Sequence, residues 1–119
     1  MKSINRLKAT QDFALAIKKG KAYRNDSFTI HLLKNECEHA RVGISVSAKL
    51  TNAVNRNRIK RQVRAMCDEL INYNECALDI VIIIRKSFML KTFDDNKENL
   101  KLLLNIRQAK EWKNIQKLL

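Results

Sequence analysis

Proline is absent from this sequence of 119 residues, glycine occurs only twice, and no apolar run is longer than five residues. A membrane-spanning helix needs roughly 20 apolar residues, so the sequence predicts no membrane span. The N-terminal stretch MKSINRLKATQDF is basic and lacks the apolar segment of a secretory signal peptide. Neither a repeat nor a low-complexity tract occurs. These absences favour a single folded domain over residues 1–119.

Cysteine is also scarce, and the spacing of the three thiols gives no pairing pattern. Cys37, Cys67 and Cys76 are odd in number and form no C-x-x-C motif, as is typical of reduced thiols in the cytosol. Cys37 and His39 could supply half of a zinc site, but the other two cysteines do not provide matching spacing. The sequence therefore predicts no protein-bound metal and a cytoplasmic location.

Acidic residues are missing where the basic residues gather. The chain carries 24 Lys and Arg against 12 Asp and Glu, a formal net charge of +12, and no acid occurs between Glu38 and Asp68. A charge this large on a small domain favours a polyanion as partner, nucleic acid first and an anionic membrane surface second. The hydrophobic fraction of 45% is ordinary for a globular protein, so we expect this charge on a folded body.

Apolar alternation predicts strands in the middle of the chain. Residues 27–33 and 41–47 alternate with period two, and the polar residues 34–40 between them predict a hairpin connection. The two strands would then be neighbours that share one apolar face and one polar face of small residues. The apolar face comprises Phe28, Ile30, Leu32, Val42, Ile44 and Val46, and the polar face Ser27, Thr29, His31, Gly43, Ser45 and Ser47. Residues 78–84 are apolar on both faces, which predicts a central strand.

Helices are expected on either side of these strands. Thr10 can cap a helix over residues 11–19, which Gly20 would end in the left-handed conformation. A last helix should begin with Asp95 or Asn96 as its cap and weaken near residues 105–108. With a further helix over the basic segment described next, the order is helix, two or three strands, helix, strand, helix. This order predicts a two-layer α/β domain.

The basic segment NAVNRNRIKRQVR, residues 52–64, contains no acid and predicts the strongest functional feature of the chain. Ile59, Val63, Met66 and Leu70 form an apolar stripe for burial. On a helical wheel the opposite side carries Asn57, Arg61 and Arg64, flanked by Arg56 and Lys60 on one edge and by Arg58 on the other. Guanidinium groups grip phosphates in bidentate fashion, so this outward arc favours a sugar-phosphate backbone over a merely solvated basic face.

Other functions have less support in the sequence. A helix-turn-helix DNA-binding protein would need a second helix just before the basic one, but residues 41–47 at that place are predicted to form a strand. A stand-alone nuclease would need paired carboxylates, and no nucleophile with a matching base stands out, so we predict no catalytic residue. A structural RNA-binding protein of ribosomal type would use the same basic face and stays an alternative.

The stretch RVGISVSAKLTNAVNRNRIKRQVR, residues 41–64, resembles the signature of the bacterial ribonuclease P protein subunit, R-x-G-x-S-V-S-K-K-x-G-N-A-V-x-R-N-R-x-K-R-x-x-R. The similarity extends through RLKATQDF near the start and IRKS after the last strand, and it ends near Gln108. The resemblance implies a two-layer α+β fold of order α-β-β-β-α-β-α, like domain 2 of a ribosomal protein. It also implies a left-handed crossover through the basic helix. A helical tail over about 108–119 lies past the resemblance.

The resemblance also implies a function. Members of this family are the protein subunit of a ribonucleoprotein endoribonuclease that removes 5′ leaders from precursor tRNA, and the RNA subunit performs the Mg²⁺-dependent hydrolysis. The implied partners are the catalytic RNA and precursor tRNA, with no membrane and no obligate protein partner.

Particular residues match the binding positions of the family. The catalytic RNA would be faced by Arg56, Asn57, Arg58, Lys60, Arg61 and Arg64, and the leader cleft would comprise Phe13, Ile17, His31, Lys49, Arg85 and Lys86. Ala48 stands where the family usually has Lys, and Thr51 where it has Gly. Ile17 and His31 occupy positions that are often aromatic, so we expect charge to carry a larger share of leader binding here than stacking does.

Overall fold

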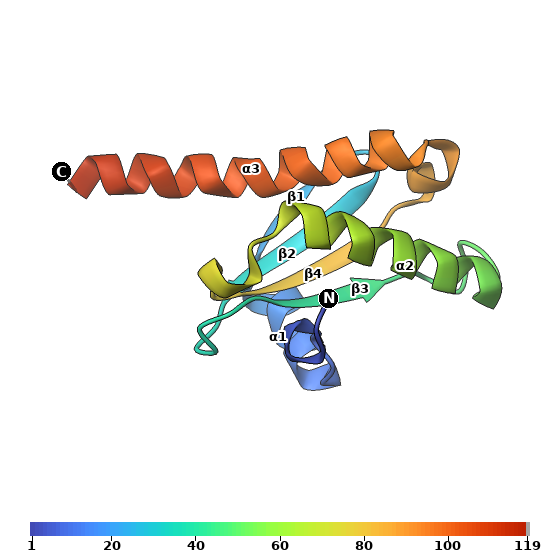
Figure 1. Cartoon of the computed structure of the whole chain (residues 1–119), viewed down its shortest axis with the longest axis horizontal. Helices are drawn as coiled ribbons and strands as arrows, with labels where there is room; N and C mark the ends of the chain where they lie inside the picture. Colours follow the sequence, from blue (N-terminus) through green and yellow to red (C-terminus); the bar gives the residue numbers. More distant parts are fainter. Residues whose placement is uncertain (119) are drawn as a thin grey trace.

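The computed structural model describes residues 1–118, with side chains described through residue 105. Its helices and strands, shown in Figure 1, are α1 (Thr10–Lys19), β1 (Lys21–Arg24), β2 (Phe28–Lys34), β3 (Arg41–Ser45), α2 (Ala53–Leu70), β4 (Leu78–Ile84) and α3 (Phe93–Leu118). Three short 3-10 helices are η1 (Ser3–Asn5), η2 (Tyr73–Glu75) and η3 (Lys86–Leu90). The expected order α-β-β-β-α-β-α and the mixed α+β class are confirmed.

The strand order of the sheet is β1-β2-β4-β3. Strand β4 pairs antiparallel with β2 and parallel with β3, so it lies between the two strands that were expected to be neighbours. The predicted hairpin over residues 34–40 is therefore wrong. The reason lies in β4, where six of the seven residues are buried; a strand that is apolar on both faces gains most from the centre of a sheet. The handedness of the β3-α2-β4 crossover stays a prediction.

The two faces of the sheet are covered by different helices. Helices α2 and α3 cover one face, and α1 lies against the other (Figure 1). The main core forms between the sheet and α2 and α3; it includes Phe28, Ile30, Val42, Val63, Met66, Ile80, Ile82, Leu100 and Leu103. A smaller cluster under α1 contains Leu7, Ala16 and Val81. The sheet with α2 and α3 is the expected two-layer body, and α1 adds a partial layer on the second face.

Helix α1 begins and ends differently from the sequence prediction. Thr10 is its first residue, the N-cap is Ala9, and no side chain caps the helix. Gly20 ends α1 in an extended conformation, with φ −73°, and not in the left-handed region. A glycine is needed there for space, because a Cβ would collide with the carbonyl of Ala16 and lie 2.9 Å from that of Leu32.

Helix α3 begins three to four residues earlier than expected. The Thr92 hydroxyl oxygen accepts a hydrogen bond from the Asp95 N–H at 3.2 Å, so Thr92 and not Asp95 or Asn96 caps the helix. Asn96 is buried inside the first turns. The helix then runs unbroken to Leu118, and the predicted weakening near residues 105–108 does not occur. No glycine or proline interrupts this segment, which leaves the local helix propensity intact.

The burial of the three cysteines differs widely. Cys37 is exposed, Cys76 is half-buried, and Cys67 is fully buried on the core side of α2. Burial raises the pKa of the Cys67 thiol to about 12. Since the thiolate is the reactive form, Cys67 should be inert in the folded protein.

We therefore expect Cys37 to react with iodoacetamide at pH 8 on the scale of an exposed thiol, and Cys67 to react at least about 1,000-fold more slowly, because so little of it is ionised at that pH. Mass spectrometry of tryptic peptides over time measures both rates. In 6 M guanidinium chloride the two rates should converge. Comparable rates in the native protein would contradict the burial of Cys67.

Candidate RNA-binding surfaces

Helix α2 carries the basic arc on a well-anchored frame. Ile59, Val63, Met66 and Cys67 are buried in the core, as the apolar stripe predicted; Leu70 at the end of the stripe is half-buried. The helix is capped by Asn52, whose side-chain oxygen accepts a hydrogen bond from the Asn55 N–H at 2.9 Å. With one side fixed in the core, the cations of α2 must face outward.

The arc residues differ in exposure but share a lack of acidic partners. Asn57, Arg58 and Arg61 are exposed, and Arg56, Lys60 and Arg64 are half-buried. Among the side chains described, through residue 105, none of the five cations of this arc forms an ion pair with a carboxylate. Arg56 is the one tied to the protein, because its Nη1 donates a hydrogen bond to the Thr51 carbonyl at 2.7 Å. The other four cations are therefore available to an anionic partner.

A hollow of about 240 Å³ connects the arc with α1. It lies beside β3, one of the two edge strands, and its lining includes Lys60 and Arg64 of α2 together with Phe13 of α1. Arg6 and Lys8 of the N-terminal segment also line it. The Leu7 N–H donates a hydrogen bond to the Val42 carbonyl at 2.9 Å, which holds this segment against β3. Arg6 and Lys8 were not among the residues predicted from the sequence, although both lie in the stretch RLKATQDF that resembles the family.

Phe13 sits directly on the sheet. A Cβ at position 43 would collide with the Phe13 ring, so only glycine allows α1 to approach β3 this closely. Phe13 is half-buried, and its ring lines the hollow while packing with Leu7 and Val81. It is thus both a packing residue of the small cluster and an aromatic wall of an open hollow.

The second face of the sheet is less open than the sequence predicted. Gly43 is buried beneath Phe13, so it cannot serve as an open floor. Val81 and Ile83 of β4 lie between Thr29 and His31 on β2 and the small residues of β3, because β4 separates the two strands. Val81 is fully buried and Ile83 half-buried. The expected polar floor is therefore apolar in its middle.

The remaining predicted leader residues lie around this face. Ile17, one turn after Phe13 on α1, is 44% exposed. His31 on β2 is half-buried, and its Nδ1 atom is buried without a hydrogen-bond partner among the described residues.

The cationic members lie at one end of the sheet. Lys49 is exposed in the loop after β3, and Arg85 and Lys86 are exposed just after β4. Because β3 and β4 are parallel, with Ser45 opposite Ile83, their carboxyl ends lie at the same end of the sheet. Arg85 is partly engaged there, since its Nη1 donates to the Asn25 carbonyl at 2.6 Å.

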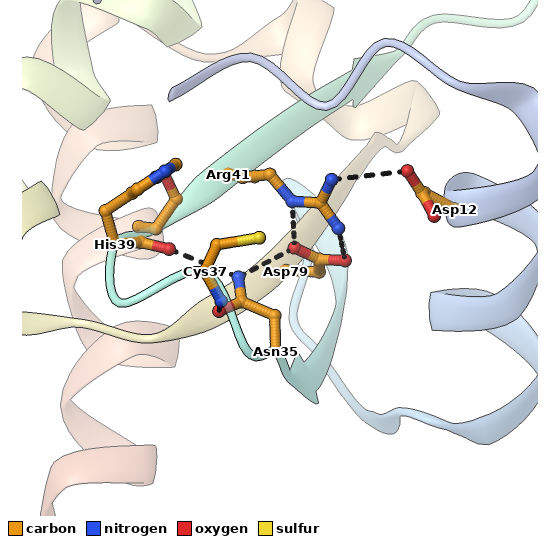
Figure 2. Close-up of polar contacts among 7 residues, drawn as sticks. Asp12, Asn35, Cys37, His39, Arg41 and Asp79 are labelled. Atoms are coloured by element: carbon orange, nitrogen blue, oxygen red, sulfur yellow. Dashed lines mark hydrogen bonds and ion pairs between the residues drawn. The ribbon is translucent and has the colours of Figure 1, made fainter. Parts of the chain in front are cut away.

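An ion-pair network at the start of β3 fixes the position of α1 (Figure 2). The guanidinium of Arg41 donates two parallel hydrogen bonds to the carboxylate of Asp79, from Nε at 2.8 Å and from Nη2 at 2.7 Å. Its Nη1 donates to Asp12 of α1 at 3.3 Å. The Asn35 amide donates to Asp79 at 2.9 Å and to the His39 carbonyl at 3.2 Å, which closes the loop between β2 and β3.

This network positions the aromatic wall. Asp79 is only 4% exposed, and burial of an unpaired carboxylate would be costly. The two hydrogen bonds from the Arg41 guanidinium offset that cost. The hydrogen bond from Arg41 to Asp79 raises the pKa of the Arg41 guanidinium further. Asp12 precedes Phe13 in α1, and Arg41 and Gly43 lie on the same face of β3. The network therefore ties α1 to the sheet next to the point where Phe13 meets Gly43.

The described part of the chain contains no group of three or more His, Cys, Asp or Glu side chains that could hold a metal ion. Nor does any helix in that part combine the length and apolarity needed to cross a membrane.

Comparison with known proteins gives a consistent result. The family model described as Ribonuclease P matches residues 1–108. The ribonuclease P protein component of Mesoplasma florum is 42% identical over 105 residues, which cover 87% of this chain and 96% of the relative. That of Bacillus mycoides is 40% identical over 101 residues, covering 84% and 88%.

Solved structures agree with the sequence relatives. The ribonuclease P protein of Staphylococcus aureus superposes with a TM-score of 0.78 at 36% identity, covering 87% of this chain and 94% of that one. The protein from Thermotoga maritima, in complex with 1-(4-fluorophenyl)-2-thiourea, gives a TM-score of 0.72 at 35% identity, covering 82% and 96%. The sequence signature, the fold and these relatives lead to one conclusion: the chain belongs to the ribonuclease P protein family and is the protein component of that endoribonuclease.

Proposed function

We propose that this protein binds the ribonuclease P RNA through the arc on α2 and the single-stranded 5′ leader of precursor tRNA beside α1. The observation that carries the proposal is the unpaired charge of α2: its five arc cations have no acidic partner among the described side chains and are anchored over a buried stripe. A charge-dense RNA supplies the missing anions, and the release of its counterions drives such binding.

The hollow beside β3 supports the leader part of the proposal. Single-strand grooves combine cations that follow the backbone with an aromatic ring on which a base stacks. Phe13 supplies the ring, and Arg6, Lys8, Lys60 and Arg64 supply charge in the same hollow of about 240 Å³. The hollow is continuous with the arc through Lys60 and Arg64, so a leader there would lie next to the bound RNA. Ile17, His31, Lys49, Arg85 and Lys86 would extend the contact over the second face and its edge.

In this proposal the phosphodiester is hydrolysed by the RNA with Mg²⁺. Hydrolysis needs a group that activates water and one that stabilises the leaving oxyanion. The Mg²⁺ ions of the reaction would belong to the RNA subunit in this proposal. The protein's own contribution is to hold the substrate in place.

Leader binding is tested with the reconstituted enzyme and two substrates, precursor tRNA with a long leader and with a one-nucleotide leader. We expect Phe13→Ala to weaken binding of the long-leader substrate about 5- to 150-fold, the worth of one stacked base. Lys86→Ala should weaken it about 5- to 8-fold at 0.1 M salt, for one lost phosphate contact. Binding of the one-nucleotide substrate should not change.

The controls separate leader binding from stability and from charge. Because the Phe13 ring packs on Gly43, the melting temperature of each variant is measured alongside. Lys21→Ala removes an equally exposed cation at the start of β1 and should leave both substrates unaffected. Protein incubated with substrate and Mg²⁺ but without RNA should cleave nothing. Equal losses for the two substrates would show that Phe13 acts through the fold and not through the leader.

A further inference from the structure

A second hollow, of about 380 Å³, lies on the other edge of α2. It is bounded by Arg58 and Gln62 of α2, by Met89 of η3 with the following Lys91, and by Phe93 at the start of α3, with Phe88 beneath. Its volume falls within the range of small-ligand sites. The hollow beside β3 uses Lys60 and Arg64, whereas this one uses Arg58, so the arc runs between the two.

One wall of this hollow is apolar, although its other lining residues are mostly polar or charged. Met89 is 45% exposed and Phe93 37% exposed, while Phe88 is buried. An exposed aromatic ring and a thioether beside a cationic arc offer a flat apolar surface to a ligand. Met89 and Phe93 are not part of the main core. Core packing alone therefore does not explain why these two apolar side chains are present.

The base of the apolar wall, Phe88, is fixed by buried contacts. Phe88 packs edge-to-face on Phe28, with ring centroids 5.6 Å apart. The buried Asn96 amide donates to the Phe88 carbonyl at 3.0 Å, and its oxygen accepts from the Ser27 hydroxyl at 2.7 Å. The hollow is therefore preorganised by the fold and does not have to form when a ligand arrives.

Three polar side chains of the hollow, Arg58, Gln62 and Lys91, are unused among the described residues, whereas Asn55 and Asn96 are hydrogen-bonded within the protein. Arg58 and Lys91 form no ion pair among the described side chains, and no hydrogen bond of the Gln62 amide occurs there either. An amide can donate and accept at once, as the edge of a nucleobase requires. Asp94 and Asp95 follow Phe93 but do not line the hollow. The combination of a flat apolar wall, one free amide and two cations at the rim fits a base with its adjacent phosphate.

We propose that this hollow binds one unpaired nucleobase of the ribonuclease P RNA, stacked on Phe93 and read at its edge by Gln62. The proposal rests on the proposed function of α2, because Arg58 belongs to both surfaces and an RNA held by the arc passes this opening. RNA-binding proteins take up unpaired bases on aromatic side chains in this way. Lys91 and Arg58 would then contact the phosphates on either side of the base.

The test measures binding of the variants to the full-length ribonuclease P RNA over a range of salt concentrations. We expect Phe93→Ala to weaken binding about 5- to 150-fold, with the slope of log affinity against log salt unchanged, because no phosphate contact is lost. Phe93→Leu, which keeps apolar volume, should weaken binding less but measurably. Gln62→Ala should also weaken it. Leu90→Ala removes a neighbouring side chain that is 86% exposed and does not line the hollow, and it should bind normally.

The salt dependence distinguishes a failure of this proposal from a failure of the proposed RNA binding by the arc. Arginine variants of the arc should change the slope of log affinity against log salt, whereas Phe93 variants should not. Unchanged affinity in both Phe93 variants, at normal melting temperature, overturns the base site alone. A photo-crosslinking residue at position 89 identifies the occupant in the reconstituted enzyme. A single unpaired position of the catalytic RNA supports the proposal, and crosslinks to the precursor tRNA leader or scattered over the RNA contradict it.

Discussion

Replacement of Arg58, Arg61 and Arg64 together by glutamine is expected to weaken binding to the ribonuclease P RNA about 100- to 500-fold at 0.1 M monovalent salt. Each phosphate contact contributes about 0.7 to 0.9 to the slope of log affinity against log salt. Three lost contacts should therefore lower the slope by about 2.1 to 2.7, which gives this factor between 1 M and 0.1 M salt. The three side chains are outside the buried stripe of α2, so the fold should persist.

A matched control removes the same charge elsewhere. Lys21, Arg24 and Lys34 are exposed on β1 and β2, outside both hollows. Their joint replacement by glutamine changes the net charge equally but should lower the salt slope by less than about 1. If the two triple variants lose affinity and slope to the same extent, overall charge and not the arc of α2 governs RNA binding.

Replacement of Arg41 by methionine is expected to lower the free energy of unfolding by about 2 to 4 kcal/mol. Loss of one partner of a buried ion pair costs about 3 to 5 kcal/mol, and the 25% exposure of the Arg41 side chain reduces that figure through solvent screening. Asp79 would keep only the hydrogen bond from Asn35 while remaining buried. Urea denaturation followed by circular dichroism measures the change.

Two further variants identify the cause. Arg41→Met combined with Asp79→Leu removes both charges and should be more stable than Arg41→Met alone, because no buried carboxylate is left unpaired. Arg24→Met, at an exposed position of β1, should change stability by less than about 0.5 kcal/mol. A double variant less stable than Arg41→Met would mean that packing around the network, and not the stranded charge of Asp79, sets the cost.

The sequence by itself determined the elements whose signals are local. The stripe from Ile59 to Met66 and the outward arc of α2 follow from helical periodicity within one segment, and the structure has both. The central position of β4 was predictable as well, because its residues are apolar on both faces. The motif over residues 41–64 identified the family, and the relatives confirm it.

Only the tertiary structure decided how distant segments meet. An alternating strand has the same pattern whichever strand lies beside it, so the sequence could not show that β4 separates β2 from β3. That insertion puts Val81 and Ile83 on the face expected to be polar. The contact of Phe13 with Gly43 lies next to the ion pair of Asp12 with Arg41, residues 29 positions apart. Both hollows beside α2 are formed by segments far apart in the chain, because shape between elements arises from packing and not from local periodicity.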